Sequence, residues 1–112
     1  MTELLTELET RLKSAWSAET ATTWMPENPA RGQCSVTALV VHDWLGGRIL
    51  KTRVGRGWHF YNWIDGRRVD LTAGQFERPV DYEDLPASHA EAFGDTSPAQ
   101  YDALLCALLS AP

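Results

Sequence analysis

The feature that most constrains the fold is the apolar segment from Cys34 to Leu45, which is followed by Gly46-Gly47. A segment of this length with apolar residues on most sides forms either a pair of strands or a buried helix. Its length and the glycines at its end favour a helix, because glycine readily ends a helix. We therefore expect one helix buried at the centre of the domain.

Three strands are predicted directly after this helix. The runs Arg48–Val54, Trp58–Ile64 and Arg67–Thr72 are separated by Gly-Arg-Gly and by Asp65-Gly66. Asp-Gly between two such runs is a strong signal for a two-residue β-hairpin. The sequence therefore predicts a three-stranded antiparallel meander.

Amphipathic helices are predicted at both ends of the chain. Leucines and Trp16 recur at three- and four-residue spacing within residues 3–17. A final helix begins at Ser97-Pro98, where serine suits the cap and proline suits the first turn. Cys106 lies at the edge of the apolar stripe of this helix, so we expect it in the core.

The stretches 18–33 and 77–96 contain prolines and glycines without periodicity, so they are predicted to be loops, with short helical turns at most in the second. At 112 residues the chain has the length of one domain with a modest core. We predict a single α+β domain over residues 1–112. In it, the Cys-bearing helix packs on a three-stranded or slightly larger antiparallel sheet, and the N- and C-terminal helices cover that core.

Charge and hydropathy argue against several classes of function. The net charge is −5, and an acidic domain has little long-range attraction for nucleic acid. No apolar run approaches the length of a membrane span, and the acidic N-terminus is unlike a secretory signal. We therefore expect a cytoplasmic protein with free thiols that binds neither nucleic acid nor a membrane.

The chemistry suggested by the sequence centres on Cys34, His59 and Asp70. Cys34 stands where a loop becomes a helix, and the positive end of the helix dipole favours thiolate over thiol. Backbone N–H groups at the same helix end can stabilise an oxyanion. A histidine that exchanges the proton and an aspartate that orients the histidine complete a nucleophilic site.

The predicted hairpin brings the histidine and the aspartate together. The Asp65-Gly66 turn pairs Tyr61 with Asp70, which puts His59 and Asp70 on one face of the sheet. Diagonal neighbours on one face lie roughly 7–8 Å apart at the backbone, a gap that their side chains can close. A register slip of one residue would place them on opposite faces.

Four further residues are candidates for contact with a peptide or small-molecule substrate. Gln33 is a possible donor beside the nucleophile, Trp58 and Tyr61 are possible walls of a cleft beside His59, and Gln75 lies just past the hairpin. Core packing is the alternative for Tyr61, and a loop hydrogen bond is the alternative for Gln75.

Two other interpretations compete with catalysis. A lone cysteine is often inert core filler, and a His–Asp pair across a hairpin is often a surface ion pair. The domain would then be a non-enzymatic module that holds a peptide or small molecule in its aromatic cleft. Cys34, His59 and Asp70 also match in number the three protein ligands of a catalytic zinc, but the spacing is not diagnostic. Our favoured interpretation implies no metal and no organic cofactor.

The stretch from Trp24 to Phe76 resembles the YunG-like family of small bacterial proteins. The resemblance covers about half of the chain, and the family's His-Tyr-Trp-Asn stands here as His-Phe-Tyr-Asn. The matching pieces are Pro29-Ala30-Arg31-Gly32-Gln33-Cys34-Ser35-Val36-Thr37-Ala38-Leu39-Val40-Val41, Asp43, Gly46-Gly47, His59-Phe60-Tyr61-Asn62, Val69-Asp70-Leu71-Thr72 and Gln75-Phe76.

More widely, the order helix-Cys, strand, strand-His, strand-Asp is similar to the transglutaminase-like branch of papain-type folds. That resemblance implies a papain- or transglutaminase-like minimal core. It also implies a cysteine-dependent acyl-transfer or amide-hydrolysis site on Cys34, His59 and Asp70. Fold-level similarity identifies no substrate.

Overall fold

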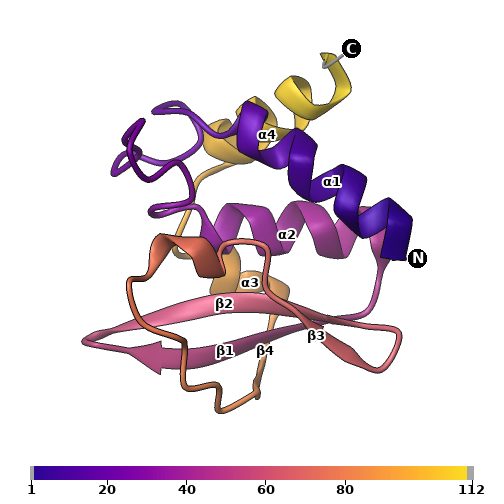
Figure 1. The fold of residues 1–112 in the computed structure, drawn as a ribbon, viewed down its shortest axis with the longest axis vertical. Coiled ribbons are helices and arrows are strands. Elements are labelled where there is room, and N and C mark those ends of the chain that lie inside the picture. Colours follow the sequence, from indigo (N-terminus) through magenta and orange to yellow (C-terminus); the bar gives the residue numbers. More distant parts are fainter. Residues whose placement is uncertain (1, 111–112) are drawn as a thin grey trace.

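A computed structural model describes residues 2–110 and shows an α+β fold (Figure 1). The helix α2 lies between a four-stranded antiparallel sheet and a layer formed by two terminal helices, α1 and α4. The elements in chain order are α1 (Thr2–Ala15), α2 (Cys34–Leu45), β1 (Arg48–Val54), β2 (Gly57–Ile64), β3 (Arg67–Val69), the 3₁₀ turn η1 (Ala73–Gln75), β4 (Leu85–Ala87), α3 (His89–Phe93) and α4 (Pro98–Ser110).

The apolar segment Cys34–Leu45 forms the predicted central helix, α2. Its first eight residues, from Cys34 to Val41, are all buried. The carbonyl of Ala38 accepts a hydrogen bond from Asn62 Nδ2 of β2 at 3.1 Å. Because this helix is enclosed by the sheet and by the other helices, its first residue has a fixed position relative to β2.

The sheet has the strand order β3-β2-β1-β4. The predicted hairpin register is confirmed within the strands, where Ile64 pairs with Arg67 and Asn62 pairs with Val69. The third strand is shorter than predicted, because β3 ends at Val69 instead of Thr72. The Asp70 carboxylate accepts a hydrogen bond from the Thr72 backbone N–H at 3.2 Å, and this local turn competes with continued strand pairing.

Two short elements lie where the sequence predicted a loop. Strand β4 pairs with β1, and Pro86 is compatible with an edge strand. Helix α3 begins with a capping box, in which the Ser88 side chain accepts from the Glu91 N–H and the Glu91 carboxylate accepts from the Ser88 N–H. The Ser-x-x-Glu pattern was a readable signal for this helix.

The two faces of the sheet have different coverings. Ile49 and Phe60 project toward α2 and α3, where they pack with Leu39 and Ala92. On the other face, Thr52, His59 and Tyr61 form hydrogen bonds with residues of the 70–84 segment. The same side of β2 that carries His59 is therefore covered by the chain that follows β3.

The terminal helices form at the predicted places, and the Ser97 hydroxyl caps α4 by accepting from the Gln100 N–H at 3.1 Å. The expectation that Cys106 is in the core is wrong, because Cys106 is exposed on α4. The stripe of α4 that is buried contains Leu104 and Leu108, and Cys106 lies outside it.

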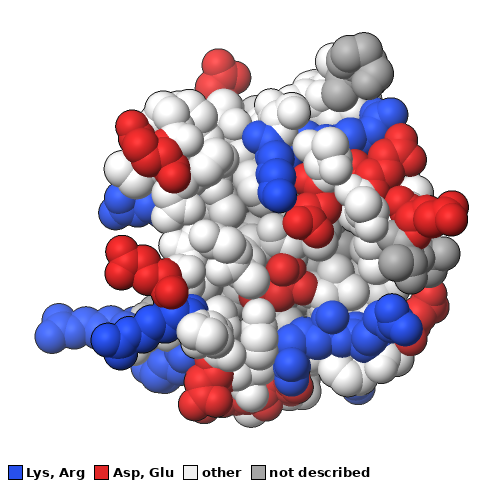
Figure 2. All heavy atoms as spheres, in the orientation of Figure 1, with Lys and Arg blue, Asp and Glu red and all other residues white. Residues whose placement is uncertain are grey.

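Within residues 2–110, no helix is long and apolar enough to cross a membrane. Figure 2 shows acidic and basic side chains interspersed over one face of the molecule.

The connection between α2 and β1 gives a stability prediction. Gly47 has φ +79°, and a Cβ atom there would lie 2.3 Å from the Trp63 carbonyl oxygen. Gly46 has a similar φ of +77°, but a Cβ atom there meets nothing within 4 Å. We expect Gly46→Ala to lower the free energy of unfolding by about 1–3 kcal/mol through backbone strain. Gly47→Ala should cost roughly 1–3 kcal/mol more, because it adds a steric clash.

Denaturant unfolding of both variants beside the wild type measures this difference. Equal losses for Gly46→Ala and Gly47→Ala would contradict the close approach of Gly47 to β2.

Candidate active site

Two of the three predicted catalytic residues, His59 and Asp70, are in direct contact. Cys34 is the first residue of α2, His59 lies in β2, and Asp70 follows the end of β3 directly. His59 Nε2 lies 2.7 Å from Asp70 Oδ2, and the two side chains are 2% and 5% exposed. Cys34 is among the groups that raise the pKa of His59, but among the described residues His59 Nδ1 has no hydrogen-bond partner. The predicted pairing of His59 with Asp70 across the hairpin is confirmed.

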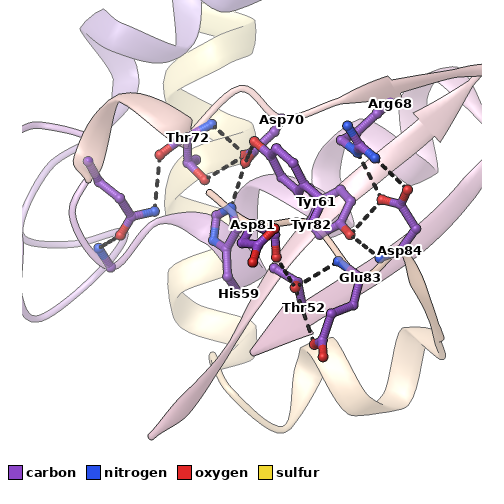
Figure 3. A network of polar contacts seen from close by, with 12 residues as sticks. Thr52, His59, Tyr61, Arg68, Asp70, Thr72, Asp81, Tyr82, Glu83 and Asp84 are labelled. Atoms are coloured by element: carbon purple, nitrogen blue, oxygen red, sulfur yellow. Dashed lines mark hydrogen bonds and ion pairs between the residues drawn. The ribbon is translucent and has the colours of Figure 1, made fainter. Parts of the chain in front are cut away.

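The Asp70 carboxylate is held by donors on both oxygens (Figure 3). Oδ1 accepts from the Thr72 N–H at 3.2 Å and from the Thr72 hydroxyl at 3.3 Å. Oδ2 accepts from His59 Nε2 and from the Tyr82 hydroxyl, each at 2.7 Å. A buried carboxylate is costly without such partners, and these donors fix its orientation toward His59.

The imidazole of His59 has one engaged nitrogen and one open nitrogen. A carboxylate only accepts hydrogen bonds, so Nε2 carries the hydrogen and Nδ1 of the neutral ring holds a lone pair. Nδ1 is buried, and among the described residues no atom completes a regular hydrogen bond to it. Because Asp70 occupies Nε2, Nδ1 is the nitrogen of the ring that stays open.

The protonation of His59 reflects opposing effects. Burial lowers the pKa of the imidazole, because it disfavours the charged form. Hydrogen bonds and charges from Asp70 and Cys34 outweigh burial and raise the pKa of His59 to about 9. A pKa of about 9 favours the charged imidazolium at neutral pH, paired with the Asp70 carboxylate.

Aromatic rings fix the plane of the imidazole. The Phe76 ring meets it edge-on with centroids 4.9 Å apart, and the Tyr61 ring stacks at 5.8 Å. A ring held by two neighbours and one carboxylate has little freedom to turn away from the thiol.

The Cys34 thiol lies at an uncapped helix end. Gln33 is the N-cap residue of α2, and its side chain makes no capping hydrogen bond. The Thr37 N–H donates to the Gln33 carbonyl, so the N–H groups of residues 34–36 have no partner within the helix. Such groups favour a nearby anion. The Cys34 residue is only 9% exposed, and it packs with Leu39 and Phe60.

Gln33 and Trp58 do not lie where a substrate role beside His59 requires them. Gln33 is 0% exposed, and its amide accepts from the Thr20 hydroxyl at 2.7 Å and donates to the Ser17 carbonyl at 3.4 Å. The amide therefore holds the preceding loop. Trp58 is exposed on the opposite face of β2 from His59, because the two residues are consecutive in a strand.

Tyr61 and Gln75 have the structural roles that were the alternatives to substrate contact. Tyr61 is 1% exposed, and its hydroxyl donates to Asp84 Oδ1 at 2.8 Å. Gln75 Oε1 accepts from the Gly32 N–H at 3.3 Å, and its Nε2 donates to the Thr72 carbonyl at 3.1 Å. Gln75 thus ties the loop before Cys34 to the turn after Asp70.

Sequence reasoning missed Thr72, Phe76 and Tyr82 as parts of the site. The Asp-x-Thr spacing was a readable signal for a turn in which threonine donates to aspartate. Tyr82 reaches Asp70 from a segment without periodicity, so no local pattern predicts that contact.

Two surface hollows flank the site. One of about 420 Å³ is lined by residues 20–23, Gly32, residues 94–96 and Gln100, most of which are polar. Another of about 470 Å³ is lined by Arg53 and residues 75–81. Neither hollow is lined by Cys34 or His59. Among residues 2–110, no group of three histidine, cysteine or acidic side chains is arranged to hold a metal ion.

Fold and site together define a class of protein: an α+β domain whose central helix begins at a buried cysteine and whose sheet carries a buried histidine held by a carboxylate. The chain belongs to the YunG family, since the family model described as "YunG protein" matches residues 4–111.

A relative in Bacillus subtilis (strain 168), described as uncharacterized protein YunG, is 50% identical over 93 residues. That match covers 83% of this chain and 81% of the relative. No solved structure matches the chain.

The geometry predicts how His59 titrates. Asp70→Asn keeps the shape of the side chain but removes the charge that raises the pKa of His59. We expect this pKa to fall from about 9, by about 1–3 pH units. Titration of the imidazole by NMR measures the change, with the His89 ring as a reference signal. A pKa of His59 that does not move in Asp70→Asn would show that the carboxylate does not control this histidine.

Proposed function

We propose that this protein is a cysteine-dependent hydrolase or acyltransferase that acts on an amide, peptide or thioester bond. The observation that carries the proposal is the buried imidazole of His59, which has Asp70 at Nε2 and a pKa that Cys34 also helps to raise. The Nδ1 atom of this imidazole is buried without a hydrogen-bond partner among the described residues, and a substrate-activating proton transfer would use it.

Each residue has a defined role in this reaction. The thiol proton of Cys34 resides on His59 Nδ1, and the sulfur attacks the carbonyl carbon of the substrate. His59 then gives its proton to the leaving nitrogen or sulfur, which leaves a thioester on Cys34. Water completes hydrolysis, or an amine or thiol completes acyl transfer, and His59 takes a proton from that nucleophile. Asp70 holds the Nε2–H throughout.

The start of α2 supplies the electrostatic part of the mechanism. Attack on a carbonyl places negative charge on its oxygen, and preorganised N–H donors stabilise that charge. The N–H groups of residues 34–36 are unused within the helix. They are the donors proposed for the oxyanion, in place of the Gln33 amide, which is bonded within the protein.

The wider fold grouping belongs to the same proposal. The order of a helix that starts with cysteine, a strand, a strand with histidine and a chain segment with aspartate supports a papain- or transglutaminase-like core. A cytoplasmic location is also proposed, because both cysteines are free and a reducing compartment preserves a nucleophilic thiol. The proposed substrate is a small molecule or a peptide.

A second candidate function is a non-enzymatic binding domain on the same fold. The observation that favours it is the low exposure of Cys34, 9%, together with its apolar neighbours. In that case the hollows beside the site hold the ligand and the thiol performs no chemistry.

Alkylation separates the two functions. If Cys34 forms an ion pair with His59, it reacts with iodoacetamide well below the pH at which an ordinary thiol reacts, about 8.5. His59→Gln should move the pH midpoint of the Cys34 reaction upward, because the imidazolium is lost. Mass spectrometry of the peptide that contains Cys34 measures the extent of reaction at each pH.

Cys106 is the internal control, since it is an exposed thiol on α4. Reaction of Cys34 only in the pH range of Cys106, with the same profile in His59→Gln, would favour the binding domain.

Acylation tests the covalent step itself. A Cys106→Ser protein treated with an activated thioester should carry the acyl group on Cys34. The adduct should decay with time, because His59 activates water. Asp70→Asn should slow this decay by about 10–10⁴-fold, the range from a modest to a full loss of acid–base catalysis. An adduct that never forms on Cys34, or that persists equally in both proteins, would oppose catalysis.

A further inference from the structure

The segment 80–84 is built against the face of the sheet that carries His59. The Thr52 hydroxyl donates to the Asp81 carbonyl at 3.0 Å, and Glu83 Oε2 accepts from the Arg53 N–H at 2.9 Å. Asp84 accepts from the Tyr61 hydroxyl and from Arg68 Nε, each at 2.8 Å. These contacts fix the chain on both sides of residue 82 (Figure 3).

Tyr82 itself is oriented by its neighbours. The Arg68 guanidinium lies 4.2 Å from the centre of the Tyr82 ring, and the Tyr61 ring meets it edge-on at 4.9 Å. The Tyr82 hydroxyl donates to Asp70 Oδ2 at 2.7 Å. This is the same oxygen that accepts from His59 Nε2.

Tyr82 is a permanent donor to this oxygen. Burial raises the pKa of the Tyr82 phenol, and the hydrogen bond to the Asp70 carboxylate raises it further. The phenol therefore keeps its proton through the whole range in which His59 titrates.

Two donors that share one carboxylate oxygen compete for its negative charge. A hydrogen bond from the neutral phenol stabilises the carboxylate whether His59 is charged or neutral. It thereby weakens the extra attraction of the carboxylate for the imidazolium. An imidazole whose pKa is close to 7 can both accept and donate a proton at neutral pH. Lowering the pKa of His59 toward 7 therefore favours catalysis.

We propose that Tyr82 is a positioning residue of the site. Its hydroxyl orients the Asp70 carboxylate and weakens the attraction between that carboxylate and the His59 imidazolium. The effect of Tyr82 on catalysis rests on the proposed function. The effect of Tyr82 on the pKa of His59 does not depend on that function.

Tyr82→Phe tests the proposal, because it removes the hydroxyl and keeps the ring contacts with Arg68 and Tyr61. We expect the pKa of His59, measured by NMR, to rise by about 0.5–1 pH unit. We also expect the acyl adduct on Cys34 to decay more slowly at neutral pH in Tyr82→Phe than in the wild type. The rate at which the adduct forms should change less than the rate at which it decays.

Tyr61→Phe is the matched control. Like Tyr82→Phe, it removes a phenol hydroxyl that donates to a carboxylate. In this case the carboxylate is that of Asp84 and not that of Asp70. The pKa of His59 should stay at its wild-type value in Tyr61→Phe. An equal rise in both variants would mean that loosening of the segment, and not the shared oxygen, moves His59.

A double substitution keeps the test decisive if Tyr82→Phe alters the fold. In the Asp70→Asn background the shared negative charge is gone, so adding Tyr82→Phe should leave the titration of His59 unchanged. An unchanged pKa of His59 in Tyr82→Phe alone, or an undiminished shift in the Asp70→Asn background, overturns the inference. A shift of His59 without any reaction at Cys34 would instead leave the inference standing and count against catalysis.

Discussion

The structure of the site depends on one buried interaction, the hydrogen bond between His59 Nε2 and Asp70 Oδ2. It assigns the hydrogen to Nε2 and leaves Nδ1 without a partner among the described residues. It also needs the chain to leave the sheet after Val69, so that the Asp70 carboxylate can accept from Thr72 as well as from His59. The early end of β3 is therefore a requirement of the site.

The central helix supplies the other half of the arrangement. Because α2 is enclosed from Cys34 to Val41, its N-terminus cannot move relative to β2 without disturbing the core. Gln75 then links the loop before Cys34 to the turn after Asp70, through the Gly32 N–H and the Thr72 carbonyl. Thiol, imidazole and carboxylate come from three distant parts of the chain, and packed elements hold each of them.

Much of this arrangement is predictable from local patterns. The length and glycine end of 34–45 gave α2, and the Asp65-Gly66 turn gave the hairpin register that pairs His59 with Asp70. Local patterns did not predict the elements and contacts that depend on residues far apart in the sequence. β4 is a strand because it meets the edge of β1, and Tyr82 belongs to the site because segment 80–84 is bound to the sheet. The aromatic residues Trp58 and Tyr61 were predictable as strand residues, but their surroundings were not.

The proposed reaction requires a Cys34 sulfur that is anionic beside a charged His59. The direct measurement is the ultraviolet absorbance of thiolate in the Cys106→Ser protein, taken against a protein that also lacks Cys34, across the pH range. If Cys34 is the proposed nucleophile, a thiolate signal is already present near pH 7 and is lost in His59→Gln. A signal that appears only around pH 8.5, the range of an ordinary thiol, and is indifferent to His59 would contradict it.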